Sequence, residues 1–170
     1  MDFVIDFDKE ISEQWNEQSE STTYIAKIGL DGKPQLESDG RTMSTAITKT
    51  INPVSVNVYN FFKPWDYRLK LAELFKLIQL KSWVTLNFRE SEDLYVSEEF
   101  KHFNKVQFDI SPLIIDTNKL FTDLKQLLQL ENMTIICKIN QEKPCQELVN
   151  MLQYILVLKN KNYPGTVLFE

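Results

Sequence analysis

Only a small part of this sequence has the residue types that nucleophilic or acid–base catalysis requires. The single histidine, His102, stands between Lys101 and Phe103. A Ser-His-acid or Cys-His site would have to include this histidine, yet no nucleophile stands at a recognisable spacing from it. Its aromatic and basic neighbours favour a surface or partly buried histidine, and a catalytic or pH-sensing role is the alternative.

The two cysteines, Cys137 and Cys145, have no histidine near them and do not form a C-x-x-C pair. Zinc sites use closely spaced cysteine and histidine ligands, so this pattern predicts no metal site. Cys137 lies in an apolar segment and is expected to be a small core residue. Because the first residues do not resemble an export signal, we expect two reduced thiols in a cytoplasmic protein.

Phosphate-binding loops cannot be written into this sequence. The four glycines stand at positions 29, 32, 40 and 165, which fits neither G-x-x-x-x-G-K-[ST] nor G-x-G-x-x-G. A carboxylate-bound magnesium ion, and with it a metal-dependent hydrolase, is the remaining catalytic alternative, around Glu90, Glu92, Asp93, Glu98 and Glu99. We favour a solvated acidic loop there, and we expect neither a metal nor a cofactor.

Charge is concentrated at one end of the chain. The 170 residues have a net charge of −5, with 43% hydrophobic and 25% charged residues, as in a soluble globular domain. Residues 1–40 contain ten acidic and three basic residues, a net charge of −7, and residues 41–170 have a net charge of +2. This balance argues against nucleic-acid binding, and no apolar run is long enough to span a membrane. A basic protein is the partner we expect, although an acidic segment that only confers solubility is the simpler alternative.

The elements that would position these residues follow from hydrophobic periodicity, which predicts one domain over 1–170. Residues 1–52 form its acidic N-terminal region. This region is expected to contain, in order, a strand at 3–7, a short helix or a surface anchor at Ile11 and Trp15, a strand at 23–28, a hairpin turn at Asp31-Gly32, and a mobile Ser/Thr-rich loop over 33–52.

Residues 53–170 form a βαβ-type body in which strands and helices alternate. Strands are expected at 54–59, 83–88, 106–110, 133–139 and 166–169. Helices are expected after Pro64-Trp65-Asp66, over 117–130 and over 145–160. We therefore predict an α/β or α+β fold, with about three long helices packed on a mixed sheet and the N-terminal hairpin at an edge.

Aromatic residues crowd the junction between the strand at 54–59 and the helix that follows it. They are Tyr59, Phe61, Phe62, Trp65 and Tyr67. Large aromatic side chains often fill such a corner of the core, which is the interpretation we favour. The alternative is an exposed patch whose tryptophan would dominate binding of a protein partner.

The order of elements over residues 106–170 is similar to that of the periplasmic domain of the ExbD/TolR family. The shared features are the strand at 106–110, the helix at 117–130, the strand at 133–139, Pro144, the helix at 145–160 and the last strand. This resemblance implies a membrane-anchored partner of a proton channel. The transmembrane helix and functional aspartate of that family have no counterpart in this sequence.

The hypothesis that fits these observations best is a non-enzymatic binding protein, a small acidic bacterial immunity or antitoxin-type inhibitor. Such a monomer or homodimer would cover the active site of a basic toxin, for example a nuclease, with acids that mimic phosphates. The residues expected to contact the partner are Asp31, Glu37, Asp39, Trp65, Glu90, Glu92, Asp93, Glu98 and Glu99. The alternatives are an assembly or scaffold subunit, including a soluble ExbD/TolR-like domain, and a carboxylate-dependent hydrolase.

Overall fold

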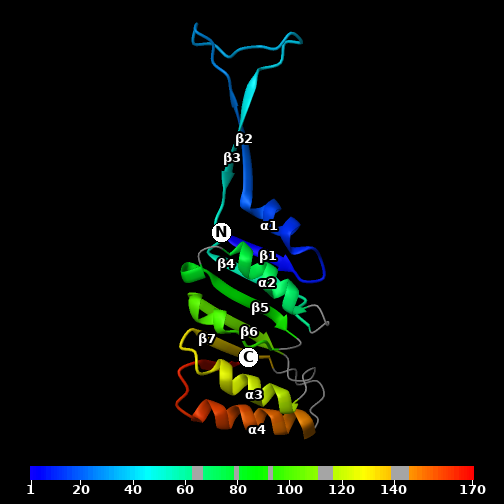
Figure 1. Ribbon diagram of the computed structural model, residues 1–170, viewed down its shortest axis with the longest axis vertical. Coiled ribbons are helices and arrows are strands. Elements are labelled where there is room, and N and C mark those ends of the chain that lie inside the picture. Colours follow the sequence, from blue (N-terminus) through cyan, green and yellow to red (C-terminus); the bar gives the residue numbers. More distant parts are fainter. Residues whose placement is uncertain (63–66, 79–80, 92–93, 111–116, 139–145) are drawn as a thin grey trace.

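The computed structural model describes residues 1–62, 67–78, 81–91, 94–110, 117–138 and 146–170. Strands and helices follow one another along most of the chain (Figure 1). Their bounds are β1 Asp2–Asp6, α1 Ile11–Ser19, β2 Glu20–Ala26, β3 Ser44–Thr50, β4 Ser55–Tyr59, α2 Tyr67–Leu77, η1 Lys81–Trp83, β5 Thr85–Ser91, η2 Glu98–His102, β6 Lys105–Ile110, α3 Thr117–Leu127, β7 Met133–Cys137, α4 Gln146–Asn160 and β8 Thr166–Phe169.

Six of the strands form one sheet in the order β1-β4-β5-β6-β7-β8. Every neighbouring pair is parallel, and each strand lies beside the next body strand in the chain. The predicted α/β class is therefore confirmed. Because parallel crossovers are right-handed, a sheet that always grows in the same direction carries all of its crossovers on the same face.

The N-terminal hairpin takes a different place from the one we expected. β2 and β3 pair only with each other and form a separate antiparallel sheet, instead of extending an edge of the main sheet. Figure 1 shows this hairpin projecting from one end of the body, with a tip that divides into two loops. We call residues 20–50 the arm. The loop predicted over 33–52 was wrong for residues 44–50, which form β3, because this segment is rich in threonine and contains Ile47, and β-branched residues favour strands.

The core lies between the sheet and the crossovers. Alternate side chains of each body strand face it, and they pack with buried residues from all four helices and from η2 in one cluster. Trp15 of α1 contacts Phe3 edge-to-face, at 5.0 Å between ring centroids. Phe100 of η2 does the same with Phe88 and Phe108, both at 6.0 Å. Of the two alternatives at Ile11 and Trp15, the structure has the short helix, with both side chains buried, and not the surface anchor.

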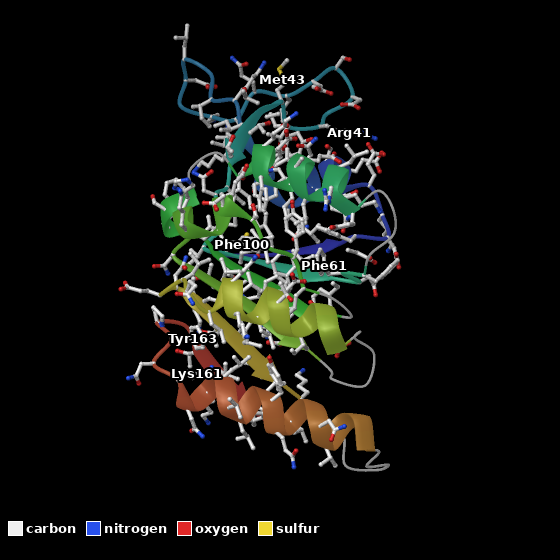
Figure 2. The ribbon with its side chains drawn as sticks, turned by 60° about the horizontal axis from the view of Figure 1, so that its bottom comes forward. Arg41, Met43, Phe61, Phe100, Lys161 and Tyr163 are labelled. Atoms are coloured by element: carbon white, nitrogen blue, oxygen red, sulfur yellow. The ribbon has the colours of Figure 1, made fainter. Side chains whose placement is uncertain are left out.

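The aromatic junction forms a corner of this core. Phe61 is completely buried, and its ring lies 4.8 Å from that of Phe88 and 5.7 Å from that of Phe7. Tyr67 packs on the cluster from the start of α2, whereas Tyr59 lies partly exposed on the opposite face of the sheet. Figure 2 shows Phe61 and Phe100 inside the body, far from Arg41 and Met43 in the arm. Trp65 lies outside the described residues.

Phe61→Ala should lower the free energy of unfolding by about 3–5 kcal/mol, because it removes a fully buried ring and leaves a cavity. Urea denaturation followed by fluorescence measures this loss. The matched control is Tyr59→Ala, which removes a partly exposed ring two residues away and should cost about 1 kcal/mol or less. Equal losses in the two variants would contradict the assignment of Phe61 to the core.

Candidate functional site

One face of the parallel sheet has no helix on it among the described residues. All-parallel sheets are usually covered on both faces, so an open face marks a surface that another molecule can cover. The side chains there are the ones that alternate with the core residues, and they are polar at most positions. We define the open face as Val4, Asp6, Asn57, Tyr59, Asn87, Arg89, Gln107, Asp109, Thr134, Ile136, Thr166 and Leu168.

Hydrogen bonds join the central polar residues of the open face across three strands. Asn57 and Asn87 are register partners, as are Asn87 and Gln107. The Asn57 Oδ1 accepts hydrogen bonds from Asn87 Nδ2 at 3.3 Å and from Arg89 Nε at 3.1 Å. Gln107 Nε2 donates to Asp109 Oδ1 at 2.8 Å. These bonds hold the side chains in one arrangement and so limit the entropy that binding would cost.

Asp109 is the one charged side chain that is buried in the described residues, at 3% exposure. Its Oδ2 accepts a hydrogen bond from Arg89 Nη1 at 3.0 Å, and the two form an ion pair. The Arg89 side chain is 37% exposed, so it contacts both the buried Asp109 carboxylate and the solvent. The pair is a fixed polar centre in the middle of the open face.

The acidic charge of the molecule lies at the β1 edge of this face and on α1. Asp6 is on β1, and Asn60 Nδ2 donates to its Oδ1 at 2.8 Å, a hydrogen bond that lowers the pKa of this carboxyl. Glu10, Glu13 and Glu17 are exposed at or along α1. Residues 1–19 contain six acidic residues and one basic residue, a net charge of −5, which equals that of the whole chain.

The acidic residues that we expected to form a binding surface are not brought together. Asp31, Glu37 and Asp39 are exposed at the arm tip, where bases accompany them. The Asp39 carboxylate, for example, forms an ion pair with Arg41, with Oδ2 and Nε 3.3 Å apart.

The remaining expected contacts lie along the body. Glu90 is exposed in β5, and Glu98 forms an ion pair with Lys101 in η2, on the crossover side. Glu99 is half-buried, and Glu92 and Asp93 lie outside the described residues. The surfaces of the arm tip and of η2 are separate, so these residues cannot act as one site within a single chain.

The residues with potential catalytic chemistry are also dispersed. His102 is exposed at the end of η2. Cys137 is a buried core residue, as predicted, and burial raises the pKa of its thiol to about 12. Within the described ranges, no three His, Cys, Asp or Glu side chains are grouped as metal ligands would be. No helix in those ranges is long and apolar enough to cross a membrane.

In comparisons with known proteins, no protein-family model, no curated protein and no solved structure matches the chain. The similarity to the ExbD/TolR family therefore stays a prediction. A signal for the open face was present in the sequence, because Asn57, Asn87 and Gln107 each stand between two core residues of a strand.

Arg89→Ala should lower the free energy of unfolding by about 2 kcal/mol, because it leaves the Asp109 carboxylate buried with Gln107 as its remaining partner. The value is below that for a fully buried pair, since water reaches Arg89. Lys105→Ala removes an exposed base at the start of β6 and should change stability by less than about 0.5 kcal/mol. Adding Asp109→Asn to Arg89→Ala should recover part of the loss. Identical urea midpoints for Arg89→Ala and Lys105→Ala would contradict this account.

The Cys137 thiol should be inert in the folded protein. With its pKa raised to about 12, it carries almost no thiolate below pH 9. In a Cys145→Ser variant, an aromatic disulfide reagent at pH 8 should react only after guanidinium unfolds the chain. The preference for the protonated thiol also contributes stability that is present below the unfolded pKa, near 9, and is lost as the pH rises toward 12. Rapid labelling of the native variant would contradict the burial of this side chain.

Proposed function

We propose that this protein is a non-enzymatic binding protein that engages a protein partner through the open face of its sheet. One observation carries the proposal: a six-stranded parallel sheet is covered on one face and carries a hydrogen-bonded polar network on the other. Flat polar surfaces fixed on strands suit recognition of another protein, because they present many groups without rearrangement. The face has polar side chains at its centre, with Tyr59 and Leu168 partly exposed among them.

The charge distribution favours a basic partner. The β1 edge and α1 carry the net charge of −5, and they border the open face on one side. Opposite charge on a partner would speed its association and orient it on this edge. A small inhibitor of the immunity or antitoxin type, which covers the active site of a basic toxin, remains the concrete form of this proposal.

The test places a photoreactive amino acid at single positions and identifies what it crosslinks in the cells of origin. Val4 and Thr134 sample the open face, and Leu69 and Val157 sample exposed positions on the helices. We expect one adduct, to a protein of positive net charge, from the first two positions and not from the controls. Adducts from the helix positions alone, or from none of the four, would overturn the proposal.

A second measurement separates charge from shape. The association rate of the crosslinked partner should fall with added salt, and neutralising Glu10, Glu13 and Glu17 together should reduce that dependence. These three side chains are exposed, so the variant should keep the stability of the parent chain. An association rate that does not change with salt would exclude electrostatic steering by α1. It would also contradict the proposal that the partner of the open face is basic.

An assembly subunit is the second candidate function, and the arm favours it. Both of its strands have an unpaired edge, and such an edge can pair with a strand of another chain. This candidate makes no use of the open face.

A further inference from the structure

The arm exposes apolar side chains that nothing in the described structure covers. Every residue of β2 and β3 is exposed, on both faces of the hairpin. Tyr24 is 71% exposed, and the other large apolar residues exposed along the arm are Ile25, Ile28, Leu30, Leu36 and Ile47. A two-stranded hairpin that buries so little apolar surface is marginally stable on its own in water. The arm is therefore an incomplete structure that association would complete.

The tip of the arm contains two copies of the same turn. Ile28, Asp31, Gly32 and Lys33 recur eight residues later as Leu36, Asp39, Gly40 and Arg41. In each copy the aspartate Oδ1 accepts a hydrogen bond from the backbone N–H two residues on, at 3.0 Å. In each copy the glycine has a positive φ, and a bridge closes the loop: Ile28 with Pro34, then Leu36 with Thr42.

The two turns are tied to the strands by three backbone hydrogen bonds that form a ring. Lys27 N–H donates to Met43, Met43 to Gln35, and Gln35 to Lys27, at 2.7 to 2.8 Å. The tip is thus a built unit rather than a loose loop. It exposes the apolar side chains of Ile28, Leu30 and Leu36, and Leu30 has no cover at all. We call these three residues the apolar knob.

An apolar cleft lies at the other end of the arm. Its volume is about 180 Å³, and Trp15, Ser19, Ile51, Leu77 and Trp83 are among the residues that line it. Ser19 immediately precedes β2, and Ile51 immediately follows β3, so the cleft opens at the foot of the arm. A single chain therefore holds an apolar knob at the tip of its arm and an apolar cleft at the base.

We propose that two copies of this chain associate by laying their arms antiparallel, β2 against β2, with the tip of each arm in the basal cleft of the other. The hydrogen bonds between β2 and β3 leave the outer edge of β2 free for this pairing. Lys27 N–H donates a hydrogen bond to Met43, which precedes β3. In an antiparallel pair, only every second residue of a strand forms hydrogen bonds with the neighbouring strand. The N–H and C=O groups of Thr22, Tyr24 and Ala26 consequently point away from β3.

The length of the arm brings tip and cleft to the same level. With a two-fold axis at Tyr24, Ile28 of one copy lies opposite Glu20 of the other, since each is four residues from Tyr24. Leu30, six residues from Tyr24, then falls at the level of Gln18, one residue from Ser19, which lines the cleft. Both contacts occur twice, as an isologous two-fold interface requires, and the assembly closes as a dimer.

Charge favours the arm over the rest of the surface for self-association. Residues 20–50 contain four acidic and four basic residues and have no net charge. Residues 1–19, by contrast, have a net charge of −5, so two bodies repel each other at this end. The proposal does not rest on partner binding by the open face, because the two surfaces share no residue.

Sedimentation velocity on the full chain tests this dimer. We expect the parent chain to be a dimer at micromolar concentration. Leu30→Asp should be a monomer at that concentration, because the dissociation constant of the dimer should rise at least tenfold to a hundredfold. Leu30 contacts nothing in a single chain, so this variant should fold, which circular dichroism verifies. Leu69→Asp, at a position on α2 that is 71% exposed, is the matched control and should remain a dimer.

A double variant tests the geometry. Leu30→Cys with Asn52→Cys should form a disulfide between two chains, and neither single variant should crosslink its copies to the same extent. A parent chain that stays monomeric up to about 100 μM, a Leu30→Asp dimer, or an open series of higher oligomers would each overturn the proposal. None of these outcomes would affect the crosslinks expected from Val4 and Thr134.

Discussion

The structure depends on one constraint: each new strand of the parallel sheet is added on the same side of the previous one. With right-handed crossovers, this order sends every helix to one face. The core then forms on that face alone, from alternate residues of each strand and the inner sides of the helices and η2. The other face is left to side chains such as Asn57, Asn87 and Gln107, which satisfy one another by hydrogen bonds instead of burial.

The arm follows from the same constraint. The connection from β1 to β4 contains α1, which supplies the crossover and buries Trp15 on Phe3. Residues 20–50 are consequently not needed to cover the sheet, and they leave the body as a hairpin. The molecule thereby separates two properties: its acidic charge stays on β1 and α1, while its exposed apolar side chains are concentrated on an arm without net charge.

Much of the fold could be predicted because most body strands alternate apolar and polar residues and the helices carry apolar stripes. Cys137 was assigned to the core from its apolar segment, and Phe61 from the aromatic junction for which a core corner was favoured. Both are buried. The order of the strands could not be read from the sequence, and without it the open face stays hidden. β3 was missed because threonines favour both strands and loops. The expected acidic surface failed because Asp39 and Glu98 form ion pairs with bases two and three residues further along the chain. The fold also places the arm tip and η2 on separate surfaces.

The claim on which the account rests is that adjacent residues of one strand face opposite environments, core and open face. Thiol labelling at Thr134 and Ile135 of β7 measures this directly, in a chain with Cys145 replaced by serine. We predict that Thr134→Cys reacts readily with a maleimide in the folded protein, because this position is only half-buried. Ile135→Cys, one residue further on, should react orders of magnitude more slowly. Equal protection of both cysteines in the folded protein would show that the second face of the sheet is covered, and would contradict the account.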